Sequence, residues 1–268
     1  MNVESRTAAG TEGLSAIKTR PGAALAAFDF DGTLAPIVDD PESARAQDGA
    51  VTALAELARH IGKVAVITGR PAAVAVEYGG LAGIDGLVVL GQYGRERWEN
   101  GTVDTPETPP GVAEARVKLP KIIATAPEGV VIEDKGHALA VHTRRAAEPE
   151  VALERLRGLI AALAERSGLV MEPGRFVLEL RPPGMDKGAA LRSLATELGS
   201  AAVLYAGDDL GDLAAFDAVE ALRAEGVPGV KVCSGSDEVI ALAERADLIV
   251  DGPPGIVRLL ESLTSELF

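Results

Sequence analysis

Two aspartates separated by one residue, Asp29 and Asp31, come directly after the apolar run 23–28. The run predicts a buried strand, and Gly32 allows the chain to turn sharply behind it. Both carboxylates are therefore expected at the carboxyl end of a strand, where open α/β sheets bind ligands. One carboxylate could act as a nucleophile, the other could carry a proton, and together they could hold a hard cation. An acidic turn without chemistry is the alternative interpretation.

Further polar side chains follow other apolar runs or open a helix. They are Thr68 after the run 64–67, Lys187 at the start of a helical stretch, and Asp208, Asp209 and Asp212 after the run 202–206. Taken singly, each has an ordinary explanation as a turn, helix-start or helix-cap residue. The carboxyl ends of parallel strands meet at one edge of a sheet, so we expect these side chains to converge.

The elements that must position these residues are aliphatic strands alternating with helices. Strands are expected at 23–28, 64–67, 87–90, 202–206, 230–233 and 248–250, and helices at 48–59, 187–198 and 237–245. Near-continuous aliphatic strands that alternate with helices predict a parallel sheet covered on both faces. The predicted fold class is α/β, with a doubly wound, Rossmann-like parallel-sheet core.

The middle of the chain has a different pattern. Helices are expected at 112–126 and 148–167, and hairpin strands at 130–134 with 138–143 and at 169–172 with 176–180. This helix–hairpin unit, used twice, predicts a small antiparallel sheet with helices on one face. Proline-rich segments at both borders fit linkers between two bodies. We therefore expect a core of residues 1–108 and 184–268 and an inserted α+β cap domain of residues 109–183.

Composition narrows the functional classes. The 268 residues carry a formal charge of −14, which argues against nucleic acid and anionic membranes as partners, because both need a basic surface. No run reaches the ~18 apolar residues of a membrane span, and no signal peptide is recognisable. The single cysteine, Cys233, permits no intramolecular disulfide. A cytoplasmic enzyme is the simplest interpretation, and an anionic substrate would need a bound metal and local cations to reverse the field.

The ordered motifs resemble those of the haloacid-dehalogenase superfamily of phosphatases. The matching segments are 29–34 (Asp-Phe-Asp-Gly-Thr-Leu), 68–70 (Thr-Gly-Arg), Lys187 and 207–212 (Gly-Asp-Asp-Leu-Gly-Asp). The insertion after the second motif resembles the α/β cap of one superfamily type. A narrower resemblance is to the trehalose-6-phosphate phosphatase family, and it is carried by the segments 91–96, 133–136, 142–144 and 174–182.

The resemblance implies a covalent mechanism. Asp29 is the expected nucleophile, and it would form an aspartyl-phosphate. Asp31 would protonate the leaving sugar oxygen and then activate the hydrolytic water. Thr68 and Lys187 would hydrogen-bond the oxygens of the transferring phosphoryl group, where charge must be stabilised.

The resemblance also implies Mg²⁺, a cation that suits carboxylate, carbonyl and phosphate oxygens. The expected ligands are Asp29, the backbone carbonyl of Asp31, and Asp208. Asp209 and Asp212 would act on these ligands through water or hydrogen bonds. Mn²⁺ accepts the same oxygen ligands, so the choice between the two metals stays open.

Substrate selection is expected to belong to the cap, together with Arg70 of the second motif. Alternate residues of a strand share a face, which places Glu133 with Lys135, and His142 with Arg144. Acidic and basic side chains in pairs suit a polyhydroxyl sugar, although charged strand edges are often only solvated. The expected substrate-binding residues are Arg70, Glu133, Lys135, His142, Arg144 and Glu179.

The implied activity is hydrolysis of trehalose 6-phosphate in trehalose biosynthesis. One alternative is a phosphatase for another sugar phosphate, such as sucrose 6-phosphate or a glycosyl-glycerate phosphate. Another is a non-catalytic sugar-phosphate sensor or a domain that regulates a synthase. A trehalose-6-phosphate synthase of the same pathway is an expected partner, and a monomer is expected.

Overall fold

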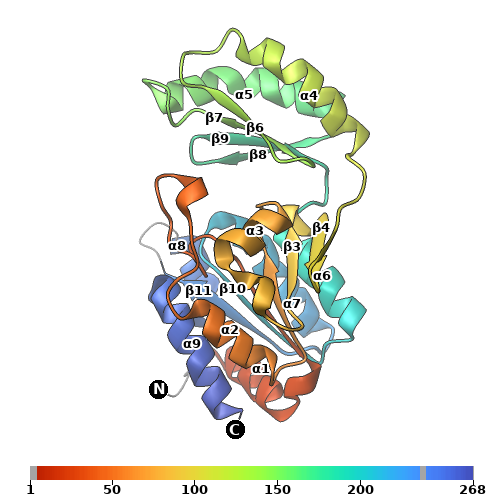
Figure 1. The fold of residues 1–268 in the computed structure, drawn as a ribbon, viewed down its shortest axis with the longest axis vertical. Helices are drawn as coiled ribbons and strands as arrows, with labels where there is room; N and C mark the ends of the chain where they lie inside the picture. The colour runs from red at the N-terminus through yellow and green to blue at the C-terminus, as the bar shows by residue number, and fades with distance from the viewer. Residues whose placement is uncertain (1–4, 236–239, 268) are drawn as a thin grey trace. The chain divides into compact units, whose positions relative to one another are not determined.

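The computed structural model describes residues 5–235 and 240–267, which fall into two compact units (Figure 1). One unit consists of Met1–Asp104 and Asp186–Phe268, and the other is the intervening Thr105–Met185. The inserted unit has an apolar core of its own, separate from the two apolar cores of the first unit. The segment Thr105–Met185, which interrupts the first unit in the sequence, thus has its own hydrophobic core.

The first unit is built on a sheet that, within the described residues, has eight strands in the order β12-β11-β10-β1-β2-β3-β4-β5. The strands are β1 Ala24–Phe28, β2 Lys63–Ile67, β3 Val88–Gly91, β4 Glu96–Glu99, β5 Thr102–Asp104, β10 Ala202–Gly207, β11 Gly229–Ser234 and β12 Leu248–Val250. The neighbours from β12 to β3 run parallel to one another, with β1 between β10 and β2. All six strands expected from the aliphatic runs are confirmed.

The β3 edge of the sheet departs from the expected parallel arrangement. Strand β4 pairs antiparallel with β3, and β5 pairs antiparallel with β4. Asn100 and Gly101 connect β4 to β5 with φ values of 51° and 80°. Positive φ at both positions is what a two-residue type I′ hairpin turn requires, and Asn-Gly is its strongest sequence signal. The sheet is therefore mixed: it is parallel from β12 to β3, as predicted for the core, and β4 and β5 add an antiparallel edge that was not predicted.

Both faces of the sheet are covered by helices. Along β1, Phe28 belongs to one apolar core, whereas Leu25 and Ala27 belong to the other. The first core is completed by α1 Ala8–Thr19, α2 Ala50–Ala58, α3 Ala72–Gly79 and α9 Gly252–Glu266, and the second by α6 Lys187–Leu198, α7 Leu213–Ala224 and α8 Ile240–Arg245. The expected doubly wound α/β core is confirmed.

The expected helices are confirmed where the structure describes them. The prediction 187–198 coincides with α6, and 48–59 contains α2. Of the prediction 237–245, α8 covers the last six positions, and residues 237–239 lie outside the described residues. Helices α3, α7 and α9 were not predicted. In the part of the chain that the structure describes, no helix combines the length and apolarity needed to cross a membrane.

The second unit contains the helix–hairpin pattern twice. Its strands are β6 Val131–Asp134, β7 Leu139–His142, β8 Val170–Gly174 and β9 Val177–Arg181, and its helices are α4 Pro110–Ile123 and α5 Pro149–Arg166. The strands form an antiparallel sheet in the order β6-β7-β9-β8. Leu119 of α4 and Ile160 of α5 share one apolar core with Val141 and Leu178 of the sheet. The α+β architecture of the inserted segment is thus confirmed.

Candidate active site

Three neighbouring strands carry polar side chains to one edge of the large sheet. Asp29 follows β1, Thr68 follows β2, and Asp208 follows β10; all three are buried. Carboxylate oxygens of Asp29, Asp208 and Asp212 lie within 4.8 Å of one another. The acidic residues that follow β1 and β10 therefore lie close together.

A buried ammonium group balances part of this charge. Lys187 opens α6 and is 5% exposed, next to the N-cap residue Asp186, whose carboxylate accepts a hydrogen bond from a backbone N–H in the first turn. Its Nζ lies 2.9 Å from Asp29 Oδ1 and 2.8 Å from Asp212 Oδ1. The more exposed Asp209 lies 3.9 Å away. The structure thus brings Lys187 together with the carboxylates of both acidic motifs.

Asp212 has a different environment from the other two buried aspartates. Its Oδ1 accepts hydrogen bonds from Lys187 Nζ and from the hydroxyl of Tyr205, the latter at 2.6 Å. Its Oδ2 accepts hydrogen bonds from the backbone N–H groups of Asp208 and Asp209 at 2.9 and 3.0 Å. Protein donors therefore occupy both oxygens, and Asp212 fixes the strand exit and the lysine. Tyr205 was not predicted as part of the site, although a tyrosine in an aliphatic strand indicates a hydroxyl that needs a hydrogen-bond partner.

The backbone at Gly32 lets the two acidic motifs approach. Gly32 has a φ of 75°, and a Cβ there would lie 1.9 Å from Asp208 Oδ2. Its carbonyl accepts a hydrogen bond of 2.8 Å from the hydroxyl of Ser234. Only glycine meets both the left-handed conformation and the close approach.

The buried carboxylates titrate abnormally because they are crowded. Burial raises the pKa of Asp29 well above its ordinary value, Lys187 opposes the rise, and Asp212 and Asp208 add to it. Burial, Asp212 and Asp209 raise the pKa of Asp208 to about 8. Burial lowers the pKa of Lys187, but Asp212 and Asp29 outweigh it and hold that pKa well above its ordinary value. The cluster therefore carries an excess of negative charge.

A divalent cation fits this cluster. Asp208 Oδ1 is a buried oxygen that accepts no hydrogen bond from the described residues, and it lies in the group of three carboxylates. Magnesium prefers such oxygen ligands and would supply the missing positive charge. With both oxygens of Asp212 occupied by protein donors, Asp29 and Asp208 are the carboxylates that could hold the ion.

Asp31 is held by Arg70. The guanidinium donates from Nε to Asp31 Oδ2 at 2.7 Å and from Nη2 to Oδ1 at 2.6 Å. The Asp31 side chain remains 40% exposed. Thr68 Oγ1 accepts a hydrogen bond from the backbone N–H of Arg70 at 3.1 Å, which leaves its own hydroxyl proton for another acceptor. The second motif thus contacts the first through a side-chain pair.

The predicted cap residues lie in the second unit. Lys135 Nζ donates to Glu179 Oε2 at 2.6 Å, and Glu133 Oε2 lies 2.7 Å from His142 Nε2. Glu133 and Glu179 pair with the same residue of β7, so they share the sheet face opposite the helix-covered core. Arg144 lies in the exposed turn after β7, apart from these pairs. The structure therefore brings four of the five predicted cap residues into two side-chain pairs.

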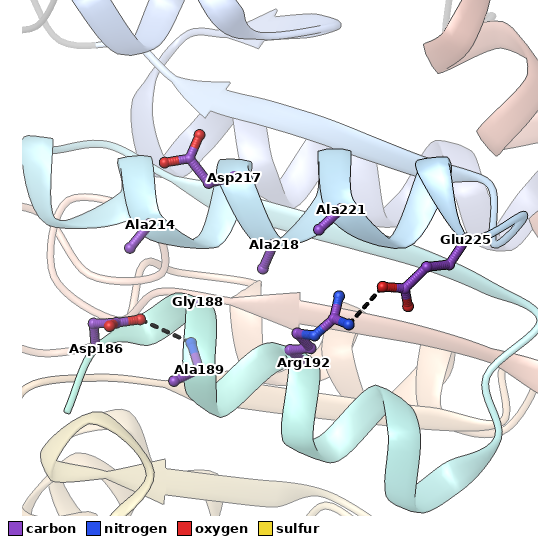
Figure 2. Close-up of a pocket in the computed structure, with 9 residues that line it drawn as sticks. All are labelled: Asp186, Gly188, Ala189, Arg192, Ala214, Asp217, Ala218, Ala221 and Glu225. Carbon is purple, nitrogen blue, oxygen red and sulfur yellow. Dashed lines mark hydrogen bonds and ion pairs between the residues drawn. The ribbon is translucent and has the colours of Figure 1, made fainter. Parts of the chain in front are cut away.

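An open groove of about 450 Å³ lies between α6 and α7 (Figure 2). Its lining residues are Asp186, Gly188, Ala189, Arg192, Ala214, Asp217, Ala218, Ala221 and Glu225. Arg192 pairs with Glu225 across it at 2.5 Å. The lining includes none of the buried acidic residues at the strand exits, so the groove is distinct from the candidate site.

Solved structures with a similar fold include one named a haloacid dehalogenase-like hydrolase. The chain superposes on a haloacid dehalogenase-like hydrolase from Bacteroides thetaiotaomicron with a TM-score of 0.65 and 16% identity, over 89% of this chain and 98% of that one. It superposes on the C-terminal domain of C. albicans trehalose-6-phosphate phosphatase with a TM-score of 0.77 and 21% identity, over 99% of each chain. The fold is that of the haloacid-dehalogenase-like hydrolases.

Sequence similarity identifies the family to which the chain belongs. The family model described as trehalose-phosphatase matches residues 27–247, and the chain belongs to that family. It is 36% identical over 251 residues to the trehalose-phosphate phosphatase of Mycobacterium avium, covering 90% of this chain and 62% of that protein. It is 34% identical over 255 residues to the Mycobacterium leprae protein of the same name, covering 90% and 57%. The chain spans about three-fifths of the length of these relatives.

Magnesium binding should depend on pH, because the ion competes with the proton on Asp208. Because the folded pKa of Asp208 is about 8 against an ordinary 3.8, the folded state holds an extra proton between these values. Without metal, this residue's contribution to the free energy of unfolding therefore decreases as pH rises through that window. Mg²⁺ must displace the proton, so the Mg²⁺-induced rise in Tm should grow from about pH 6 to about pH 8.5. Melting curves with Mg²⁺ or EDTA measure it, with Asp208→Asn as the control; a pH-independent shift in the wild-type protein would contradict this expectation.

Gly32→Ala should damage the same site. The left-handed backbone alone costs a Cβ-bearing residue about 1–2 kcal/mol, and the methyl group would displace Asp208 from its position. We expect a lower Tm and loss of the Mg²⁺-induced rise. Gly22→Ala is the matched control, since nothing lies within 4 Å of a Cβ at that position. A Gly32→Ala protein that still gains wild-type stability from Mg²⁺ would refute the close-approach argument.

Proposed function

We propose that this chain is a Mg²⁺-dependent phosphatase that hydrolyses trehalose 6-phosphate to trehalose and phosphate. The observation that carries the proposal is the buried cluster of Asp29, Lys187 and Asp208, in a chain of the trehalose-phosphatase family. Relatives named trehalose-phosphate phosphatase, at 34–36% identity, support the choice of substrate.

The first chemical step transfers the phosphoryl group to Asp29. A carboxylate oxygen of Asp29 forms a bond to phosphorus while the bond from phosphorus to the sugar oxygen breaks. Asp31 enters this step protonated and donates its proton to that leaving oxygen, which departs as the alcohol of trehalose; Asp31 is left as the carboxylate that Arg70 contacts. The contact of 2.9 Å between Lys187 and Asp29 supports this role, because the ammonium favours the ionised nucleophile.

The second step removes the phosphoryl group from Asp29. Asp31 takes a proton from a water molecule, the water oxygen bonds to phosphorus, and the bond to Asp29 breaks to release phosphate. Throughout, the Thr68 hydroxyl and the Lys187 ammonium hydrogen-bond phosphoryl oxygens, where negative charge is greatest. The buried position of both groups supports this, since their interactions are stronger away from water.

Asp29, Asp208 and the backbone carbonyl of Asp31 would hold the magnesium ion. When bound, the ion supplies positive charge that offsets the carboxylates and the phosphoryl oxygens. Asp212 maintains the ligand Asp208 through its backbone N–H, and Asp209 lies beside both. Mn²⁺ could occupy the same oxygen ligands.

Recognition of the sugar is assigned to the cap. The pairs Lys135–Glu179 and Glu133–His142 offer both donors and acceptors on one sheet face, which is what a polyhydroxyl group requires. Arg144, exposed in the following turn, adds a further donor. These five residues are proposed to contact trehalose hydroxyl groups.

The cellular setting follows from the same proposal. We place the protein in the cytoplasm as a monomer that consumes the product of a trehalose-6-phosphate synthase. The single cysteine, Cys233, is buried, and burial raises the pKa of its thiol to about 11. Such an inert thiol is compatible with a reducing compartment.

The direct test is phosphate release from trehalose 6-phosphate, glucose 6-phosphate and sucrose 6-phosphate, with Mg²⁺ and with EDTA. We expect Mg²⁺-dependent release from trehalose 6-phosphate alone, and none from an Asp29→Asn protein that keeps its fold. Release from another sugar phosphate would reject the substrate while keeping the chemistry. Turnover by Asp29→Asn would reject the nucleophile, and inactivity of the wild-type protein would favour a sugar-phosphate sensor.

The cap assignment makes a separate prediction. Lys135→Met removes a donor paired with Glu179, and a hydrogen bond to a charged group is worth about 1.5–3 kcal/mol. KM for trehalose 6-phosphate should rise roughly 10- to 100-fold, whereas hydrolysis of p-nitrophenyl phosphate, which has no sugar, should change little. Lys118→Met is the control, because Lys118 pairs with Glu114 on helix α4. Equal losses on both substrates would indicate damage to the fold instead.

A further inference from the structure

Arg70 is the partner that holds Asp31. It follows Thr68 and Gly69 directly after β2, and its guanidinium forms a two-pronged contact with both oxygens of Asp31 at 2.6 and 2.7 Å. Such a fork fixes the plane of a carboxylate as well as its distance. The Arg70 side chain is 16% exposed, against 40% for Asp31. The more buried residue therefore anchors the more exposed one.

The guanidinium of Arg70 is itself held on several sides. Its remaining nitrogen, Nη1, donates to the carbonyl of Pro41 at 2.9 Å. Its carbon lies 5.7 Å from the centre of the Phe30 ring and 5.5 Å from the centre of the Tyr78 ring. These cation–π contacts and the backbone acceptor restrict the rotamers of Arg70. All three guanidinium nitrogens already have partners in the protein.

The proposed reaction requires an accurately positioned Asp31 carboxyl group. It must place one oxygen beside the leaving sugar oxygen and later beside a water molecule. A 40% exposed aspartate next to a glycine turn would otherwise exchange between rotamers. A misplacement of about 1 Å at a catalytic group can cost about 100-fold in rate.

We propose that Arg70 is a positioning residue that acts through Asp31, in place of the substrate contact expected from the sequence. This inference rests on the proposed function, because it needs Asp31 to serve as the proton donor. It assigns Arg70 to the chemical step that depends on the leaving group. Binding of the phosphoryl group is left to Thr68 and Lys187.

Substrates with different leaving groups distinguish a positioning role of Arg70 from a role in binding the substrate. An alcohol leaves only with a proton from Asp31, whereas p-nitrophenolate leaves without one. In rapid-quench measurements of the first turnover, Arg70→Met should slow trehalose release by about 100-fold and leave the p-nitrophenol burst from p-nitrophenyl phosphate nearly unchanged. Arg70→Lys, which keeps the charge but lacks the fork, should recover part of the alcohol rate.

Arg45 supplies a matched control. Its guanidinium lies 4.7 Å from the centre of the same Tyr78 ring and donates to the carbonyls of Glu42 and Ala44. Arg45 shares the aromatic contact and the neighbouring loop, but these hydrogen bonds go to backbone carbonyls, whereas Arg70 donates to Asp31. Arg45→Met should therefore leave both first-turnover rates at the wild-type level. A selective alcohol defect in Arg45→Met as well would point to the loop, and would overturn the assignment to Arg70.

The outcomes distinguish the inference from the proposed function. Equal slowing of both substrates by Arg70→Met, or a rise in KM for both with unchanged first-turnover rates, would overturn the positioning role. Wild-type protein that cleaves a different alkyl phosphate would reject trehalose 6-phosphate alone, and the comparison of leaving groups would then use that alkyl ester. Wild-type protein that cleaves no alkyl phosphate would reject the proposed function, and with it the role of Asp31.

Discussion

The site depends on one electrostatic constraint, the burial of three carboxylates around a single ammonium group. Asp29, Asp208 and Asp212 approach within 4.8 Å, and Lys187 contacts two of them. Each buried ion costs several kcal/mol in lost hydration unless a partner compensates it. One lysine cannot compensate three aspartates, so the cluster must take up a proton or a cation. Under the proposed function, a cation held by this cluster would reverse the field locally, so that a chain with a net charge of −14 could bind a phosphate ester.

The backbone around the cluster is shaped by the same constraint. Asp212 can reach the N–H groups of Asp208 and Asp209 only because Gly207 has no side chain; a Cβ there would lie 2.2 Å from Asp212 Cγ. Tyr205, two residues earlier, is fully buried and donates to the same carboxylate. The end of β10 and the two residues after it thus carry three of the donors that fix Asp212, together with the candidate metal ligand Asp208. A loss of any one donor would leave a buried charge less satisfied, with consequences for Lys187 and Asp29.

The strands and the polar residues that follow them were predictable from the sequence, because they depend on local patterns. Apolar runs followed by Asp29, Thr68 and Asp208 predicted strands and their exits, since burial and turn chemistry are readable within a few residues. The pairing of Asp31 with Arg70 was not predicted, because it joins side chains 39 residues apart and depends on their rotamers. The antiparallel edge was not predicted, although the Asn-Gly pair is a hairpin signal in the sequence. Strands β4 and β5 are short and contain charged residues, so they lack the aliphatic run that identified the other strands.

The cap was predictable in pattern but not in register. Alternation within one strand showed that Glu133 and Lys135 share a side, but only the pairing across β7 places Glu133 and Glu179 on one face. The resulting contacts differ from those of the core in charge balance. Lys135 and Glu179 are a matched pair, whereas the core cluster has surplus negative charge. Under the proposed function, the two halves of the substrate divide in the same way. The anionic phosphate would go to the site that requires a cation, and the neutral sugar would go to the sheet face where the paired Lys135 and Glu179 offer hydrogen bonds.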